Sequence, residues 1–158
     1  MTPPPEFTID HASADQLERH LGQCDAGFVP PLSTRVELGA YTRKLVQRAT
    51  RFEAWHDGTL VGVVAAYFDG TDRGVAHISN VSVLPGWGSR GVARALLLRC
   101  IEHGRRTAML QITLEVAADN GAACRLYRRA GFRALEPAAS TLAMTLDLTP
   151  EPHDESAA

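Results

Sequence analysis

A glycine-rich turn at residues 85–91 separates an apolar run ending at Leu84 from a helical spacing of apolar side chains that begins at Val92. Glycine lets the backbone approach ligand oxygens closely, and the first N–H groups of a helix have no partner inside it. The helix dipole favours negative charge at the same end. The sequence therefore predicts an anion site suited to a pyrophosphate, formed by Gly88, Ser89, Arg90, Gly91, Val92 and Ala93.

A second segment, DNGAACRLYRRAGF at residues 119–132, follows the strand-like LEV that ends at Val116. Together the two segments resemble the acetyl-CoA-dependent N-acetyltransferases of the GNAT superfamily. That family has the turn pattern Gln/Arg-x-x-Gly-x-Gly/Ala, followed later by Asn-x-x-Ala-x-x-Leu-Tyr-x-x-x-Gly-Phe. The second pattern is matched here by Asn120, Ala123, Leu126, Tyr127, Gly131 and Phe132, and the resemblance is close over residues 75–132.

The turn departs from the family pattern at one position. Gly88 stands where the family has Gln or Arg, whereas Gly91 and Ala93 match. Because the family binds pyrophosphate mainly through backbone N–H groups, the loss of one side chain is expected to weaken the site without abolishing it. Arg90 is either a replacement for the missing side chain or an ordinary solvated arginine, and the sequence leaves both interpretations open.

The resemblance implies that an acetyl group moves directly from acetyl-CoA to a primary amine in a ternary complex. It assigns to Val81 the backbone N–H that polarises the thioester carbonyl, and to Val83 a strand-like pairing with the pantetheine. Asn120 would hydrogen-bond the cofactor arm, and Tyr127 would protonate the leaving thiolate. A phenol with a reference pKa of about 10 is a suitable acid for a thiolate whose thiol has a pKa of about 8.5.

Two residues are candidates for the base that takes the proton of the amine. Glu115 precedes Tyr127 by twelve residues, a spacing that resembles ribosomal-protein N-terminal acetyltransferases, in which such a glutamate is the base. His77 lies fourteen residues before Gly91, where histone-type acetyltransferases place a base glutamate on the central strand. Strand alternation predicts that His77 shares one face with Ser79, Val81 and Val83. A water relay would suffice for an amine of low pKa.

The elements that position these residues alternate along the chain. The patterns predict strands over residues 7–9, 51–55, 59–68, 75–83, 108–116 and 141–148, and helices over residues 14–21, 35–49 and 92–104 and between residues 119 and 131. We expect Ser13 to cap the first helix and Gly22 to end it, and Asp119 to cap the last. Asp57-Gly58 is expected to form a hairpin turn, with Val61, Val63 and Ala65 on one strand face.

This order indicates an α/β fold, with a mixed sheet and helices on both faces. The resemblance implies the GNAT fold, in which the sheet is mostly antiparallel and the two central strands splay apart around the cofactor. We expect one GNAT acetyltransferase domain over residues 6–148, with a disordered lead over residues 1–5 and a disordered tail over residues 149–158. The family's variable region, which comprises the first two predicted helices and the loop between them, offers Phe28, Pro30, Pro31 and Tyr41 as candidates for the acceptor wall.

Composition narrows the partners. The 158 residues carry a net charge of −2, which gives no basic field for nucleic acid, and the longest apolar runs are too short to span a bilayer. A soluble cytoplasmic protein is therefore expected. Cys24, Cys100 and Cys124 do not have a metal-site spacing and are expected to be reduced thiols, so no metal is predicted. A homodimer through the last strands is compatible with the sequence, which does not establish one.

The sequence is consistent with more than one class of acceptor amine. Short matches to bacterial GNAT proteins of aminosugar and surface-polysaccharide pathways favour an amino sugar or another small-molecule amine. The spacing of Glu115 and Tyr127 favours protein N-terminal or lysine acetylation as the alternative. A non-catalytic module that binds acyl-CoA is the alternative of a different class, since Gly88 replaces the family's Gln or Arg.

Overall fold

The computed structural model of the protein describes residues 4–28, 30–69, 74–135 and 140–148. The tail expected at residues 149–158, and all but Pro4 and Pro5 of the expected lead, lie outside the described residues. Within the described residues, no helix has both the length and the apolar character needed to cross a bilayer.

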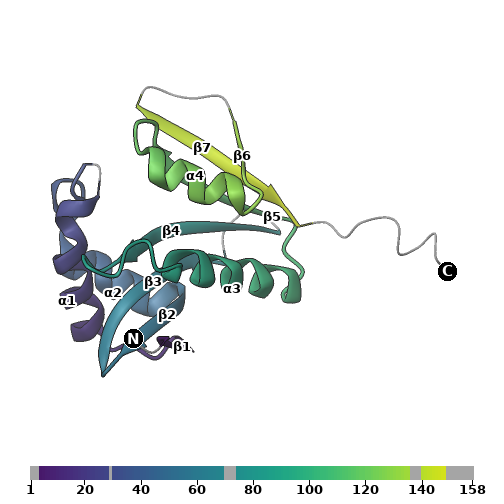
Figure 1. Ribbon diagram of the computed structural model, residues 1–158. Coiled ribbons are helices and arrows are strands. Elements are labelled where there is room, and N and C mark those ends of the chain that lie inside the picture. The colour runs from purple at the N-terminus through teal and green to yellow at the C-terminus, as the bar shows by residue number, and fades with distance from the viewer. Residues whose placement is uncertain (1–3, 29, 70–73, 136–139, 149–158) are drawn as a thin grey trace, which may run out of the picture.

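The described elements follow the predicted order (Figure 1). The strands are β1 (Glu6–Ile9), β2 (Thr50–His56), β3 (Thr59–Tyr67), β4 (Val75–Val83), β5 (Gln111–Ala117), β6 (Arg133–Ala134) and β7 (Thr141–Asp147). The α-helices are α1 (Ala14–Cys24), α2 (Leu38–Arg48), α3 (Val92–Arg106) and α4 (Gly121–Arg129), and the short 3₁₀ helices are η1 (Asp25–Gly27) and η2 (Leu32–Thr34). The short strand β6 and both 3₁₀ helices were not predicted.

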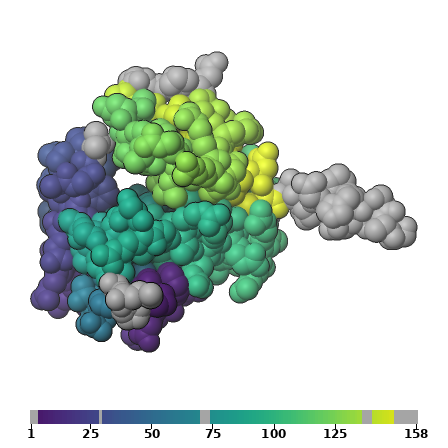
Figure 2. Space-filling view, in the orientation of Figure 1, coloured from purple at the N-terminus to yellow at the C-terminus, as the bar shows by residue number. Residues whose placement is uncertain are grey.

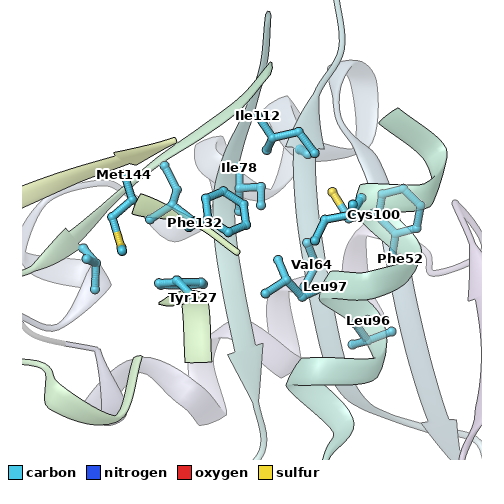
Figure 3. Packing of buried hydrophobic residues seen from close by; sticks show 14 of the residues in the cluster. Phe52, Val64, Ile78, Leu96, Leu97, Cys100, Ile112, Tyr127, Phe132 and Met144 are labelled. Atoms are coloured by element: carbon cyan, nitrogen blue, oxygen red, sulfur yellow. The ribbon is translucent and has the colours of Figure 1, made fainter. Parts of the chain in front are cut away.

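Helices cover both faces of one mixed sheet, as predicted. The strands lie in the order β1-β2-β3-β4-β5-β7-β6, and every neighbouring pair is antiparallel except β4 and β5. One core cluster joins α3 and α4 to the sheet and includes Phe52, Leu97, Tyr127 and Met144 (Figure 3). A second cluster joins α1 and α2 to the opposite face.

The two central strands splay apart, which confirms the expected pair. Strands β4 and β5 are paired only from Val75 with Gln111 to His77 with Thr113, although both strands continue well beyond these residues. Past His77, one edge of β4 therefore has no partner strand among the residues that the structure describes. Figure 1 shows the two strands diverging on the side from which α3 starts.

Two β-bulges contradict the faces predicted from strict alternation. In β4, Ala65 pairs with Asn80 but Ala66 pairs with Ile78, so Ser79 is an extra residue. In consequence His77 lies on the α1/α2 face, whereas Val81 and Val83 lie on the α3 face, and the predicted shared face is wrong. A second bulge at Val61 in β3 places that residue in the α3 cluster, while Val63 and Ala65 belong to the α1/α2 cluster.

Helix ends were predicted with mixed success. Ser13 caps α1 and forms a capping box with Gln16, as the sequence indicates. Gly22 does not end that helix, which continues to Cys24. For α4 the cap is Asn120 rather than Asp119, because the Asn120 side chain accepts the Ala123 N–H.

A buried ion pair ties the N-terminal segment to the sheet. Glu53 is fully buried and accepts hydrogen bonds from the Thr8 hydroxyl, the His11 and Ala12 N–H groups and the Arg51 guanidinium, whose Nε lies 3.2 Å from Glu53 Oε2. Arg51 is buried too, and its Nη2 donates to the Ala12 carbonyl at 3.1 Å. One carboxylate therefore satisfies donors from β1, from the loop before α1 and from β2.

Candidate active site

A cleft of about 470 Å³ opens where β4 and β5 part. Figure 2 shows a hollow bounded by the purple and blue N-terminal region, the teal chain around α3 and the green α4. Five of the predicted site residues line the cleft, namely Val81, Val83, Glu115, Asn120 and Tyr127. These residues come from two strands and one helix, so the splay is what brings them together.

The wall of the cleft on the β4 side is formed by a part of β4 that is not paired with β5. Residues Ser79 to Val83 line the cleft, and the β4–β5 ladder has already ended at His77. Unpaired strand-edge N–H and C=O groups can bind an extended ligand as an added strand. This location suits the roles predicted for Val81 and Val83.

Tyr127 projects from α4 into the region between α4 and β4 (Figure 3). Its ring contacts Phe132 edge-on, with centroids 6.0 Å apart, and only 7% of the residue is exposed. Burial raises the pKa of Tyr127 to about 12, with a smaller contribution from Cys124. The phenol therefore stays protonated at neutral pH, and the raised pKa makes it a weaker acid than a phenol in water.

The two candidate bases occupy different places. Glu115 is exposed and lines the cleft. His77 is not among the lining residues, and its Nδ1 lies 2.9 Å from the Thr113 hydroxyl on β5. Burial lowers the pKa of His77, and the nearby Glu115 charge opposes that shift. The geometry thus favours Glu115 as the group that meets an amine in the cleft.

Asn120 is the N-cap of α4 and also lines the cleft. Its Oδ1 accepts the Ala123 N–H at 3.2 Å. The amide group carries two N–H donors as well as this oxygen, so capping leaves its donors for a ligand. The helix cap consequently fixes the orientation in which those donors are presented.

The glycine-rich turn begins α3 with an open N-terminus. Gly91 is the N-cap with a φ of 80°, no side chain caps the helix, and the first turn contains no acidic residue. An added Cβ would meet no atom within 4 Å at Gly86, Gly88 or Gly91. This fifteen-residue helix thus starts without a side-chain cap and after glycines with open space beside them, which fits the predicted pyrophosphate site.

Arg90 stacks against a neighbouring aromatic residue. Its guanidinium carbon lies 4.6 Å from the centroid of the Trp87 ring, which in turn contacts the His56 ring at 5.0 Å. Arg90 is exposed, so its charge remains beside the turn.

Several lining residues were not singled out from the sequence as site residues. Cys24 and Arg35 come from the N-terminal region, and Asn80 and Ser82 alternate with Val81 and Val83 on β4. Phe28 and Pro30 line the same end of the cleft, as predicted for the acceptor wall, but Tyr41 hydrogen-bonds Ser79 instead. All three cysteines are free and buried.

Comparison with known proteins identifies the family. The protein-family model described as Acetyltransferase (GNAT) family matches residues 15–132, which is most of the chain. The chain belongs to this family. The solved structure of the ribosomal-protein-S18-alanine N-acetyltransferase from Escherichia coli has the same fold, with a TM-score of 0.74, 19% identity and coverage of 94% of this chain and 98% of that chain.

Other relatives extend the comparison. The mycothiol acetyltransferase of Propionibacterium freudenreichii subsp. shermanii is 32% identical over 143 residues, covering 82% of this chain and 44% of the relative. The mycothiol acetyltransferase of Thermobispora bispora is 34% identical over 110 residues, which cover 61% of this chain and 37% of that relative. The chain thus spans less than half the length of these relatives. The PaiA N-acetyltransferase from Thermoplasma acidophilum, solved in complex with coenzyme A, has a TM-score of 0.69 at 16% identity over 90% of this chain and 99% of that chain.

Proposed function

We propose that this chain transfers the acetyl group of acetyl-CoA to a primary amine of a small molecule, by direct attack in a ternary complex. The observation that carries the proposal is the cleft between β4 and β5, which gathers Val81, Val83, Glu115, Asn120 and Tyr127 on its walls. The proposal assigns the activity to one domain over residues 6–148.

Each part of the reaction has a residue in the cleft. The amine nitrogen attacks the thioester carbon, and the N–H of Val81 stabilises the negative charge that develops on the carbonyl oxygen. Glu115 receives the proton of the amine. When the carbon–sulfur bond breaks, Tyr127 gives its proton to the thiolate, so that the products are an amide and a neutral thiol.

The residues that would hold the cosubstrate come from the start of α3, outside the residues that line the cleft, and from two walls of the cleft. The open start of α3, from Gly88 to Ala93, suits the pyrophosphate, and the free edge at Val83 suits the amide groups of the pantetheine arm. The Asn120 amide lies on the opposite wall. Acetyl-CoA supplies the activated acyl group, and the thioester would then lie between Val81 and Tyr127.

The side chains that line the cleft bear on the nature of the acceptor. Phe28 and Pro30 contribute apolar surface, while Arg35 and Glu115 carry opposite charges. The relatives named mycothiol acetyltransferases support a small-molecule amine, and an amino sugar is our first choice. The twelve-residue spacing of Glu115 and Tyr127 supports a protein N-terminus as the second candidate.

A melting experiment combined with a thiol-release assay tests this proposal. Acetyl-CoA at about one hundred times its Kd is expected to stabilise the protein by about 2.7 kcal/mol. Thiol release is then measured with amino sugars and their nucleotide conjugates, peptides with a free N-terminus, polyamines and aminoglycosides. Release with amino sugars supports the proposal, and release with peptides alone supports the second candidate. Stabilisation without release indicates a binding module, and no stabilisation contradicts the cosubstrate.

Restoring the family side chain at Gly88 gives a further prediction. We expect Gly88→Arg to tighten coenzyme A binding about tenfold, because a charge-assisted hydrogen bond to a phosphate contributes roughly 1.5–3 kcal/mol before the cost of ordering the side chain. Stability should not change, since no atom lies within 4 Å of the added Cβ. Calorimetric titration with coenzyme A measures the effect, and Gly88→Ala is the matched control. Equal affinity in all three proteins would show that a side chain at position 88 does not reach the phosphates.

A further inference from the structure

The cleft-facing part of β4 is held by side chains from the helices on its other face. Ser79, Asn80 and Ser82, which surround Val81, all hydrogen-bond through their side chains. Tyr41 from α2 lies 2.6 Å from the Ser79 hydroxyl and donates to the Ser79 carbonyl at 3.2 Å. His20 from α1 reaches Ser82 on the other side of Val81. This segment has no β5 partner at its edge, so these contacts from the α1/α2 face help to hold it in place.

His20 is the centre of the contact with Ser82. The residue is 1% exposed, its Nδ1 lies 2.9 Å from the Leu60 carbonyl, and its Nε2 lies 2.9 Å from the Ser82 hydroxyl. The Ser82 hydroxyl in turn lies 2.8 Å from Asn80 Oδ1. Both Asn80 and Ser82 are buried and line the cleft. A chain of hydrogen bonds therefore runs from a buried titratable ring to both neighbours of Val81.

Which groups donate and which accept in this chain of hydrogen bonds depends on the protonation state of the His20 ring. The Leu60 carbonyl can only accept, so Nδ1 carries a proton in every state. In the neutral ring Nε2 accepts a proton from the Ser82 hydroxyl or from the Cys24 thiol, and when Ser82 is the donor the Asn80 amide turns its NH₂ group toward Ser82. In the charged ring Nε2 donates to Ser82, which is then free to donate to Asn80 Oδ1. The two ring states thus orient Ser82 and Asn80 differently.

We propose that His20 is a positioning residue, which sets the orientation of the Val81 peptide toward the thioester carbonyl through Ser82 and Asn80. The inference rests on the proposed function, because it takes Val81 as the donor to that carbonyl. Tyr41 fixes the same segment independently at the Ser79 bulge. A peptide group held on both sides is pre-organised for the transition state and does not have to reorient during the reaction.

The surroundings of His20 favour the neutral ring at neutral pH. Burial lowers the pKa of His20, although its hydrogen bonds to Leu60 and Ser82 oppose that shift. On its own helix, Cys24 Sγ lies 3.6 Å from Nε2, and Asp15 and Arg19 line a second cleft of about 170 Å³ that His20 also lines. Burial raises the pKa of Cys24 to about 11. The buried residues of α2, Gly39, Thr42 and Leu45, carry no titratable group, and the contacting β3 and β4 groups are the Leu60 carbonyl and the Ser82 hydroxyl.

An acceptor-independent spectrum tests the inference. Isotope-edited infrared difference spectra of carbonyl-¹³C acetyl-CoA report how strongly the bound thioester carbonyl is polarised. In the unaltered protein we expect its stretch to move to lower frequency on binding. In His20→Gln and in Ser82→Ala we expect most of that shift to be lost, while the Kd for acetyl-CoA stays within about twofold. With an active amine, kcat should fall about ten- to hundredfold at unchanged KM for acetyl-CoA.

Two further measurements separate positioning from a purely structural role. The carbonyl frequency of the unaltered protein should change as the pH falls through the lowered pKa of His20, and His20→Gln should lack that change. His103→Gln, on α3 against Phe52 and Phe68, is the matched control and should keep both the shift and its pH dependence. Ser82→Ala interrupts the same chain of hydrogen bonds at its middle and provides the test if the His20 variant does not fold.

Three outcomes overturn the inference. An unaltered carbonyl shift in both His20→Gln and Ser82→Ala shows that the chain does not position Val81. A pH dependence that persists in His20→Gln shows that another group controls the carbonyl. Failure of the unaltered protein to bind acetyl-CoA removes the proposed function as well, and is distinguished because no bound carbonyl is then observed.

Discussion

Tyr127→Phe is expected to lower kcat by about 10²- to 10³-fold, because general acid catalysis typically contributes a factor of this size. The affinity for acetyl-CoA should change little, since the ring and its edge-on contact with Phe132 are retained. Burial raises the pKa of Tyr127 to about 12, and an acid is active only below its pKa. Loss of the Tyr127 proton should therefore not reduce kcat of the unaltered enzyme until the pH approaches that value.

Steady-state kinetics with thiol release, together with calorimetric titration of acetyl-CoA, measure both quantities. Tyr67→Phe is the matched control, because Tyr67 packs with the α1/α2 cluster and does not line the cleft. Its kcat should remain within about twofold of the unaltered value. Unchanged thiol release in Tyr127→Phe would contradict the acid role.

Glu53→Ala should destabilise the fold by about 3–5 kcal/mol, which is the usual cost of removing one partner from a buried ion pair. The substitution leaves the Arg51 guanidinium without its buried counter-ion. It also removes the acceptor of the Thr8 hydroxyl and of the His11 and Ala12 N–H groups. For a domain of this length the melting temperature should fall by roughly 10 °C.

Urea unfolding provides the free energy of unfolding, and an unchanged m value shows that the same surface is exposed. Glu102→Ala on α3 is the control, because Glu102 forms an exposed ion pair with Arg106 and should contribute less than about 1 kcal/mol. A change in Glu53→Ala no larger than in this control would mean that the buried carboxylate contributes little to stability.

The sequence was sufficient for the order of the elements and for most of one wall of the site. Apolar periodicity and the Asp57-Gly58 turn located β2, β3, β4 and α3, and family patterns located Val83, Asn120 and Tyr127. These features are local, since each depends on residues close together in the chain. The roles assigned to these residues stay predictions.

The faces of the strands depend on pairing, which periodicity does not contain. The bulge at Ser79 inserts one residue opposite β3, so that His77 and Val81 point to opposite faces although they are an even number of residues apart. His20 was missed for a related reason. It occupies an apolar face of α1 with Leu17, Leu21 and Cys24, where its partner Ser82 is sixty-two residues away. A histidine on an otherwise apolar helix face is the signal that could have drawn attention to it.

Because the β4–β5 ladder is short, few backbone hydrogen bonds hold the two parts of the sheet together. Strands β1 to β4 form one paired unit and β5 to β7 another. In the part of the chain that the structure describes, the direct backbone links between these strands are the pairs from Val75–Gln111 to His77–Thr113 and, just before them, the Leu110 and Gln111 N–H groups that donate to the Gly74 carbonyl. A molecule that fills the cleft and pairs with the free edge of β4 would act as the missing rung between the two units. Ligand binding would then be part of the cohesion of the sheet, and hydrogen exchange of β5 to β7 would slow together with that of β4 when the cleft is filled.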